Sequence, residues 1–553
     1  MPGSVFAKLP YAFPDANVAS WKQIQAHVSQ LSGFEPQIYH CCINSCCCFV
    51  GPYAELSSCS YCNESRYDSD GKPRQIFTYL PVIPRLQAAF ANRDMAAKMR
   101  YRAHEYQHDP DIVKDVFDSS HYRSLLLKHV TVNGRILSHT FFNDSRDVAL
   151  GISTDGFAPF RKRKKTCWPL ILFDYNLPPE IRFHIQYILS LGIIPGPKKP
   201  VDFDSFLWPA IQEFIRLEIG IHTYDILSDE FFAMRAYVIL VFGDIPAISM
   251  VLRMKGHNGL FPCRMCKIRA VPIPGGNTHY VPLDRSCCPS QLPDMPSVYD
   301  PLNLPLRTHE GFLQDAHRVQ SAPTNAASED LAKLCGIKGV AALTVLSSLS
   351  FPASFPYDFM HLIYENLLKN LMLLWSGNYK DIGNGSETYV FQQTVWEAIG
   401  AATAQSGSSI PSAFGPRPPN VATDKVSWTA DTRAFWALSI GPVVLRECFL
   451  RPKYYAHFVE LIRLLNICLQ FEIDRSDISV LREGLATWVK DYERCVVFMH
   501  RQVYILYISI HLLVSTISTI LNVSQPVHSL FMPYSISLIA SLQLVQFGPH
   551  GHF

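Results

Sequence analysis

The chain has 553 residues, of which 48% are hydrophobic, and a formal net charge of +2. This length and this apolar content exclude a disordered or fibrous chain and allow two or three domains. The balanced charge excludes the basic excess of an autonomous DNA-binding domain, so any DNA contact depends on local patches. Sixteen cysteines, with no recognisable secretory signal, favour metal-binding thiols in the cytosol or nucleus.

The first predicted element is a helix over residues 21–31, within an N-terminal remnant of residues 1–35. A CxxxC…CxxC pattern follows, with twelve residues between its two pairs. This spacing is close to what a tetrahedral Cys₄ zinc site needs from two short knuckles. The predicted zinc ligands are Cys42, Cys46, Cys59 and Cys62. Three neighbouring cysteines, Cys41, Cys47 and Cys48, leave the register open, and a cysteine-rich loop without metal is the alternative.

Residues 84–107 predict an amphipathic basic helix. Apolar side chains recur at near-helical spacing, and five cations are interleaved with them: Arg85, Arg93, Lys98, Arg100 and Arg102. A solvated surface and a phosphate-contacting surface are both compatible with this pattern.

Two aspartates mark the centre of the chain. Asp155 follows an apolar run that begins at Val148 and predicts a strand. Asp244 follows a second run, Tyr237 to Phe242, which is typical of a buried strand, and Pro246 then opens a predicted helix. Carboxylates at two strand ends suit a site where Mg²⁺ is held together with phosphate oxygens.

Between these acids lies an unbroken basic run, followed by further predicted elements. A strand is expected over 168–173, and helices over 178–191 and 203–217. The basic run lies where it could hold a DNA backbone near the reacting phosphate, and a nuclear-localisation patch is a compatible use. Its residues are Arg161, Lys162, Arg163, Lys164 and Lys165.

Beyond Asp244, Cys263 and Cys266 form a CxxC pair. A structural metal and a tight turn with two packed thiols are both open. Ligands that would complete a metal site are His257, His279, Cys287 and Cys288. Residues 271–345 are rich in Pro, Ser, Asn and Asp and predict an irregular insertion.

Several motifs in this order resemble the catalytic core of CACTA-type (En/Spm-like) DDE transposases, particularly those of fungal genomes. They are CCINSC, CSYCNESRYDSDGKPRQIFTYLPVIPRLQ, TDGFAPFRKRKKTCWPLILFDYNLPPEIRF, LGIIPGPKKPVDFDSFLWP, FGDIPAISMVLRMKGHNGLFPCRMC and FPYDFMHLIYENLLKNL. The resemblance covers roughly residues 30 to 500. It implies a ribonuclease H-like α/β core, interrupted by a mainly helical insertion and preceded by a zinc-ribbon-like module.

The resemblance also implies a mechanism. Asp155, Asp244 and a glutamate would hold Mg²⁺ for DNA cleavage and joining at transposon ends. Asp358 and His361 match a D-x-x-H element that recurs in the family before that glutamate, and we expect both to shape the site. An N-cap aspartate with a satisfied histidine is the alternative. Glu365, the nearest acid, is not assigned as the third carboxylate.

Residues 379–425 are rich in Gly, Ser and Pro and predict a second linker. Helices are expected over 432–450, 453–472 and 476–497. They would form the helical insertion that such transposases place before their last acid.

The last 52 residues contain no Asp, Glu, Lys or Arg. The third acid is therefore missing from the expected place, and a frameshift or translated intron near Gln502 explains this most simply. Val503 to Leu521 is also long enough for a bilayer span, which its Ser, Thr and His residues weaken. The sequence thus predicts a nuclear, DNA-binding transposase relic with impaired catalysis. A domesticated scaffold, a membrane-tethered protein and a homo-oligomer remain alternatives.

The predicted organisation has seven parts. They are a remnant (1–35), the zinc-ribbon-like module (36–70), a helical connection (71–145), the core (146–270), the irregular insertion (271–345), the D-x-x-H helix with the helical insertion (346–501) and the uncharged tail (502–553).

Overall fold

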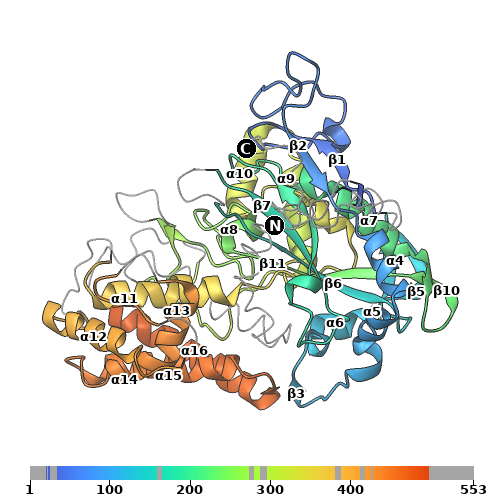
Figure 1. Ribbon diagram of the computed structural model, residues 1–553. Helices are drawn as coiled ribbons and strands as arrows, with labels where there is room; N and C mark the ends of the chain where they lie inside the picture. Colours follow the sequence, from blue (N-terminus) through green and yellow to red (C-terminus); the bar gives the residue numbers. More distant parts are fainter. Residues whose placement is uncertain are drawn as a thin grey trace. The chain divides into compact units, whose positions relative to one another are not determined.

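The computed structural model describes residues 20, 23–24, 34–158, 165–272, 279–286, 295–379, 388–411, 417–424 and 428–496. The chain forms two compact units (Figure 1). Among the described residues, the first comprises those within 20–106 and 129–238, and the second comprises those within 107–128 and 239–496. The boundary at 238/239 falls inside strand β11. The helix predicted over 21–31 lies almost entirely outside the described residues.

A mixed six-stranded sheet organises the α/β architecture, in the order β1-β2-β8-β7-β6-β11. Its strands are β1 (Gln37–His40), β2 (Ile76–Tyr79), β6 (Val148–Thr154), β7 (Trp168–Asp174), β8 (Leu189–Ile194) and β11 (Ala236–Phe242). All seven residues of β6, β7 and β11 are buried. Strands covered on both faces need continuous apolar runs, which is why these three could be predicted.

Strands β6, β7 and β8 form an antiparallel meander. Helix α7 (Asp204–Ile219) and the hairpin of β9 (Ile221–Asp225) and β10 (Glu230–Met234) then lead to β11. Val148 N donates to Arg235 O at 2.8 Å, so β6 and β11 begin side by side. Neighbouring strands whose first residues pair run in the same direction, and their carboxyl ends lie at the same sheet edge.

The helix predicted over 178–191 is wrong. This stretch contains a short 3₁₀ turn, Ile185–Tyr187, and the strand β8. Gly192 has a φ of +141°, and a Cβ atom there would collide with the carbonyl oxygen of Thr78. The close approach of β2 to β8 therefore requires glycine, and this tertiary contact outweighs the helical pattern of the apolar residues.

The predicted basic helix is divided into three pieces: α4 (Ile83–Ala91), α5 (Arg93–Lys98) and a π-helical turn, Tyr101–Glu105. Arg85 donates to the carbonyl oxygens of Leu80, Pro81 and Ser190. Lys98, Arg100 and Arg102 also bind groups of the same unit. Most of these cations therefore form contacts within the unit that stabilise the fold. Neither the solvated surface nor the phosphate-contacting surface considered above describes them.

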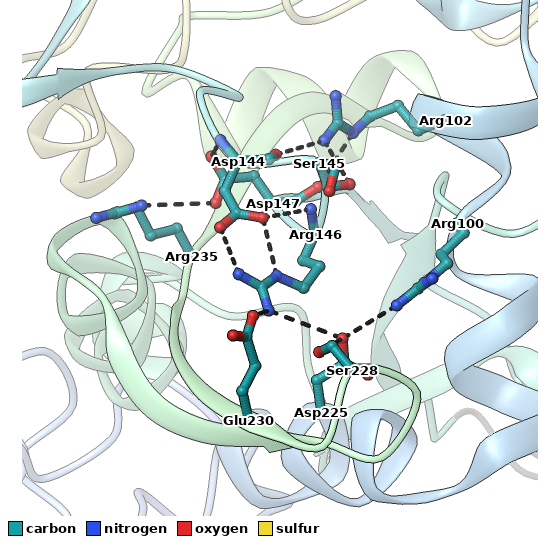
Figure 2. Close-up of polar contacts among 10 residues, drawn as sticks. All are labelled: Arg100, Arg102, Asp144, Ser145, Arg146, Asp147, Asp225, Ser228, Glu230 and Arg235. Atoms are coloured by element: carbon teal, nitrogen blue, oxygen red, sulfur yellow. Dashed lines mark hydrogen bonds and ion pairs between the residues drawn. The ribbon is translucent and has the colours of Figure 1, made fainter.

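Figure 2 shows the polar network that ties the segment before β6 to the β9–β10 hairpin. Arg146 contacts Asp144 at 2.9 Å and Glu230 at 2.7 Å, and its guanidinium lies over the ring of Phe232. Asp225, at 1% exposure, accepts from Arg100 at 3.2 Å and lies 3.8 Å from Arg146. These ion pairs fix the amino-terminal side of β6.

We expect Arg146→Met to lower the free energy of unfolding by about 3 kcal/mol, because removing one partner of a buried ion pair leaves a carboxylate poorly compensated. Urea denaturation measures this loss. Arg463→Met is the matched control, since Arg463 forms an exposed pair with Glu460 on one helix and should change stability by less than about 0.5 kcal/mol. Equal losses in both variants would contradict a structural role for the network.

Asp174, at the end of β7, is buried, and burial raises its pKa from 3.8 to about 7. At pH values between 3.8 and about 7, Asp174 keeps its proton in the native state and has lost it in the unfolded state. Stability from this group is therefore fully present at low pH and is lost as the pH rises toward 7.

Asp174→Asn should flatten this decline, because the amide oxygen can still accept the hydrogen bond from Asn176 N but does not ionise. The measurement is the free energy of unfolding at several pH values from about 4 to about 7.5, where one proton changes it by about 1.4 kcal/mol per pH unit. The exposed Asp70→Asn serves as the control. A decline as steep in Asp174→Asn as in the wild type would show that Asp174 is not the titrating group.

The second unit is mainly helical (Figure 1). It contains α8 (Ile245–Val251), α9 (His309–Gln320), α10 (Asn325–Cys335), the π-helix η6 (Met360–Leu368), α11 (Lys369–Trp375), α12 (Gln393–Ser406), α13 (Ala430–Phe435), the π-helix η8 (Trp436–Ile440), α14 (Gly441–Val444), α15 (Pro452–Cys468) and α16 (Arg475–Val496). Its core contains many aromatic side chains, among them Trp436 and Trp488.

Composition misled the prediction at two stretches of this unit. Residues 271–345, expected to be irregular, contain α9 and α10, and residues 379–425, expected to be a linker, contain α12. Helices α9 and α10 begin at Thr308 and Thr324, whose hydroxyls accept from Gly311 N and Ala327 N. Capping thus explains part of the polar composition. The helices predicted near 453–472 and 476–497 are present as α15 and α16.

The remaining short elements lie at the edges of the units. They are β3 (Ile112–Val113), α6 (Ser120–Leu125), β4 (His129–Val132), β5 (Arg135–Thr140), β12 (Val271–Pro272), β13 (His279–Tyr280) and β14 (Ile473–Asp474). Across the described part of the chain, no helix is both long and apolar enough to cross a bilayer. The segment 503–521 lies outside the described residues.

Candidate functional site

Asp244 lies two residues after β11 and caps helix α8. Its Oδ1 accepts from Ala247 N at 2.5 Å. Within the described residues, Oδ2 makes no hydrogen bond. A short loop from a buried strand to a capped helix therefore fixes the carboxylate through one of its two oxygens.

Asp358 and His361 begin the π-helix η6. Asp358 Oδ1 accepts from His361 N at 3.1 Å, and its Oδ2 lies 3.2 Å from His361 Nδ1. The predicted N-cap contact is thus present, and it occurs together with a side-chain pair. A π-helical segment is uncommon and is frequently found at functional sites.

Electrostatics link these residues to Asp244. Burial is the largest cause that raises the pKa of Asp244, and the neighbouring carboxylate of Asp358 raises it as well. The hydrogen bond from Ala247 N lowers this pKa, as do the charges of His361 and Arg264. Two carboxylates, an imidazole and a guanidinium therefore share one neighbourhood of the second unit, in which only the carboxylates offer the oxygen ligands that a hard divalent cation prefers.

Asp155 directly follows β6 and is partly buried. The next residue, Gly156, lies against the indole of Trp168, and a Cβ atom there would collide with that ring. Asp155 is therefore placed at the carboxyl end of β6 by a close contact with β7. Of the basic run, Lys165 is described and exposed, and Arg161 to Lys164 lie outside the described residues.

The four predicted zinc ligands come together. The Sγ atoms of Cys42, Cys46, Cys59 and Cys62 all lie within 4.8 Å of one another. A tetrahedral site with Zn–S bonds of about 2.3 Å has Sγ atoms about 3.8 Å apart, so the group fits a structural zinc ion. Within the described residues, this is the one such group of three or more possible metal ligands.

The thiols differ in how readily they ionise. Burial raises the pKa of Cys42 to about 11. Burial also opposes ionisation of Cys62, yet hydrogen bonds from Glu64 N and from the Asn44 side chain bring its pKa down to about 7. A metal ion must therefore release protons on binding, and Cys62 is the ligand that enters most easily as a thiolate.

The cysteine module is joined to the amino-terminal end of α7. Val201 N and Asp202 N both donate to Cys46 O, and Cys48 N donates to Ser205 Oγ at 2.9 Å. The hydroxyl of Tyr53 donates to Asp202 at 2.7 Å. Because β2 continues the same chain into the sheet, the module is built into the edge of the α/β unit.

The second cysteine pair forms a tight turn. Cys263 Sγ accepts from Met265 N and Cys266 N at 3.3 Å each, and both thiols are buried. His257 does not join them as part of a three-ligand group. Of the other proposed ligands, the side chain of His279 and both Cys287 and Cys288 lie outside what the structure describes.

The structure gives a place to two residues to which the sequence assigned no role. Glu365 pairs with Arg433 at 2.8 Å, and this pairing satisfies its charge. Arg264, which the sequence analysis passed over, is 3% exposed and lies beside the acids. The sequence feature that could have drawn attention to Arg264 is its position between the two cysteines of FPCRMC.

The comparison with known families is consistent with this arrangement. Residues 131–281 match the model of the transposase family tnp2, which supports a transposase-derived origin for that segment. The matched segment includes Asp155, Asp244 and the second cysteine pair. No curated protein matches the chain.

The register of the zinc ligands can be tested with neighbouring cysteines. We expect Cys46→Ser to lose bound zinc and to lower the melting temperature, because one ligand is removed from a site whose binding energy contributes to folding. Cys47→Ser should keep zinc, although Cys47 Sγ lies only 4.0 Å from Cys59 Sγ. Metal content by mass spectrometry decides between them, and zinc lost from Cys47→Ser alone would reverse the assignment.

Proposed function

We propose that this protein derives from a CACTA-type DDE transposase with a ribonuclease H-like core. Its ancestral activity is Mg²⁺-dependent DNA strand cleavage and transfer at transposon ends, in the nucleus. One observation carries the proposal. Two neighbouring strands that begin side by side, β6 and β11, are each followed by an aspartate within the family-matched segment.

The strand order supports this proposal. Strand β11 is the neighbour of β6 in the sheet, and the two strands begin side by side, which favours carboxyl ends on the same side. In the proposed site Asp155 and Asp244 would hold Mg²⁺, and Asp358 and His361 would shape the surroundings of Asp244.

When bound, Mg²⁺ would activate a water or 3′-hydroxyl nucleophile and stabilise the leaving oxygen of an in-line phosphoryl transfer. The residues of the chain do the rest. Asp244 stays oriented through its bond to Ala247 N. Lys165 is exposed, and with the basic run before it would hold the DNA backbone by phosphate contacts, largely without base readout.

Catalysis is expected to be impaired. We assign no glutamate as the third acid, and two candidates are engaged elsewhere: Glu365 is paired with Arg433, and Glu493 accepts from Leu283 N and Asp284 N. Loss of one carboxylate of three weakens metal binding without removing it. A domesticated DNA-binding protein is the second candidate, favoured by the intact cysteine module.

Metal binding and cleavage test the proposal together. We expect calorimetry with Mn²⁺ to show weak binding that falls at least tenfold in Asp155→Asn and in Asp244→Asn, because each variant removes an anionic ligand. Plasmid nicking with Mn²⁺ should be slow in the wild type and undetectable in both variants. Asp70→Asn, an exposed acid, is the matched control.

Two results would refute this account in different ways. Unchanged Mn²⁺ binding in both aspartate variants would remove the metal site. Tight DNA binding with no nicking at any Mn²⁺ concentration would favour the domesticated DNA-binding protein.

A further inference from the structure

Arg264 is buried in the second unit and makes its polar contacts to the segment just before Asp358. Its Nε donates to Phe355 O at 2.8 Å and its Nη2 donates to Pro356 O at 2.6 Å. Backbone carbonyls cannot move independently of the chain that carries them. The guanidinium therefore fixes the path of the two residues that precede the ring of Tyr357 and the carboxylate of Asp358.

The ring of Tyr357 completes this contact. The Arg264 guanidinium lies 3.6 Å from the ring centroid, and Tyr357 is 1% exposed. Arg264 N donates to the Tyr357 hydroxyl at 3.3 Å, and Cys263 Sγ lies 3.6 Å from that hydroxyl. The planar guanidinium thus stacks on the ring while it donates at its edge, a combination that a lysine ammonium cannot reproduce.

The turn around Cys263 presents the arginine in this position. Because Cys263 Sγ accepts from two following backbone N–H groups, the chain reverses tightly at Arg264. The buried thiols therefore have a use that needs no metal ion: they shape the turn that directs the guanidinium.

We propose that Arg264 is a positioning residue. Together with Tyr357 it forms a clamp that holds the Asp358–His361 turn beside Asp244. The proposal rests on the proposed function only for its effect on metal binding. The effect on the segment itself is independent of that function.

The first experiment measures the segment without metal or DNA. Hydrogen–deuterium exchange of the peptide covering residues 355–362 should rise at least tenfold in rate in Arg264→Lys, because an ammonium cannot donate to both carbonyls and stack on the Tyr357 ring at once. The matched control is Arg285→Lys. Arg285 is also buried, lies over Tyr299 at 4.7 Å and donates to Pro282 O and Arg269 O. This control should leave exchange in 355–362 unchanged.

The second experiment measures Mn²⁺ affinity in the full chain. Arg264→Lys and Arg264→Met should both bind Mn²⁺ at least tenfold more weakly than the wild type, and Arg285→Lys should bind as the wild type does. If Arg264 acted by charge alone, the lysine variant would match the wild type and the methionine variant would bind more tightly, and the proposal would be overturned.

The two measurements separate the possible failures. Unchanged exchange in Arg264→Lys overturns the clamp. Raised exchange with unchanged Mn²⁺ affinity, while Asp244→Asn weakens binding, shows that the segment does not shape the metal site and also overturns the proposal. If Asp244→Asn binds Mn²⁺ as the wild type does, the proposed function fails, and the exchange measurement alone decides the clamp.

Discussion

Burial of β6, β7 and β11 on both faces is the constraint on which the structure depends. A strand enclosed on both sides cannot shift its register without exposing apolar residues, so the residue that follows it is held at a defined place on the sheet edge. The polar network around Arg146 and Asp225 fixes the opposite end of β6. A rigid strand that is fixed at one end is a suitable support for the carboxylate of Asp155, which would bind a cation in the proposed function.

Short local contacts orient the acidic side chains discussed above. Asp244 caps a helix, Asp358 accepts from His361 N in the first turn of a π-helix, and Gly156 allows the turn after β6 to lie against Trp168. Such contacts orient a carboxylate before any ligand arrives, which reduces the ordering cost of binding. The cysteine module lies at the edge of the α/β unit, where it is joined to α7 and, through β2, to the sheet.

The sequence predicted the parts of this arrangement that local pattern determines. Continuous apolar runs predicted β6, β7 and β11, and the CxxxC…CxxC spacing predicted a cysteine group that the structure confirms. The strand β8 was mistaken for a helix because its identity depends on the approach of β2 at Gly192, which no local pattern shows. Arg85, Arg100 and Arg102 were read as surface charges because each has a partner far away in sequence, respectively Ser190 O, the Asp225 carboxylate and Asp147 O. Arg264 was missed for the same reason.

The proposed function requires that Asp155 and Asp244 bind the same divalent cation. Anomalous diffraction from crystals of the protein grown with Mn²⁺ tests it most directly. The account predicts a manganese peak bonded to a carboxylate oxygen of each aspartate at about 2.2 Å, close to the distances that other hard divalent ions make with oxygen ligands. Manganese bound elsewhere, with the two aspartates on opposite sides of the molecule, would contradict it.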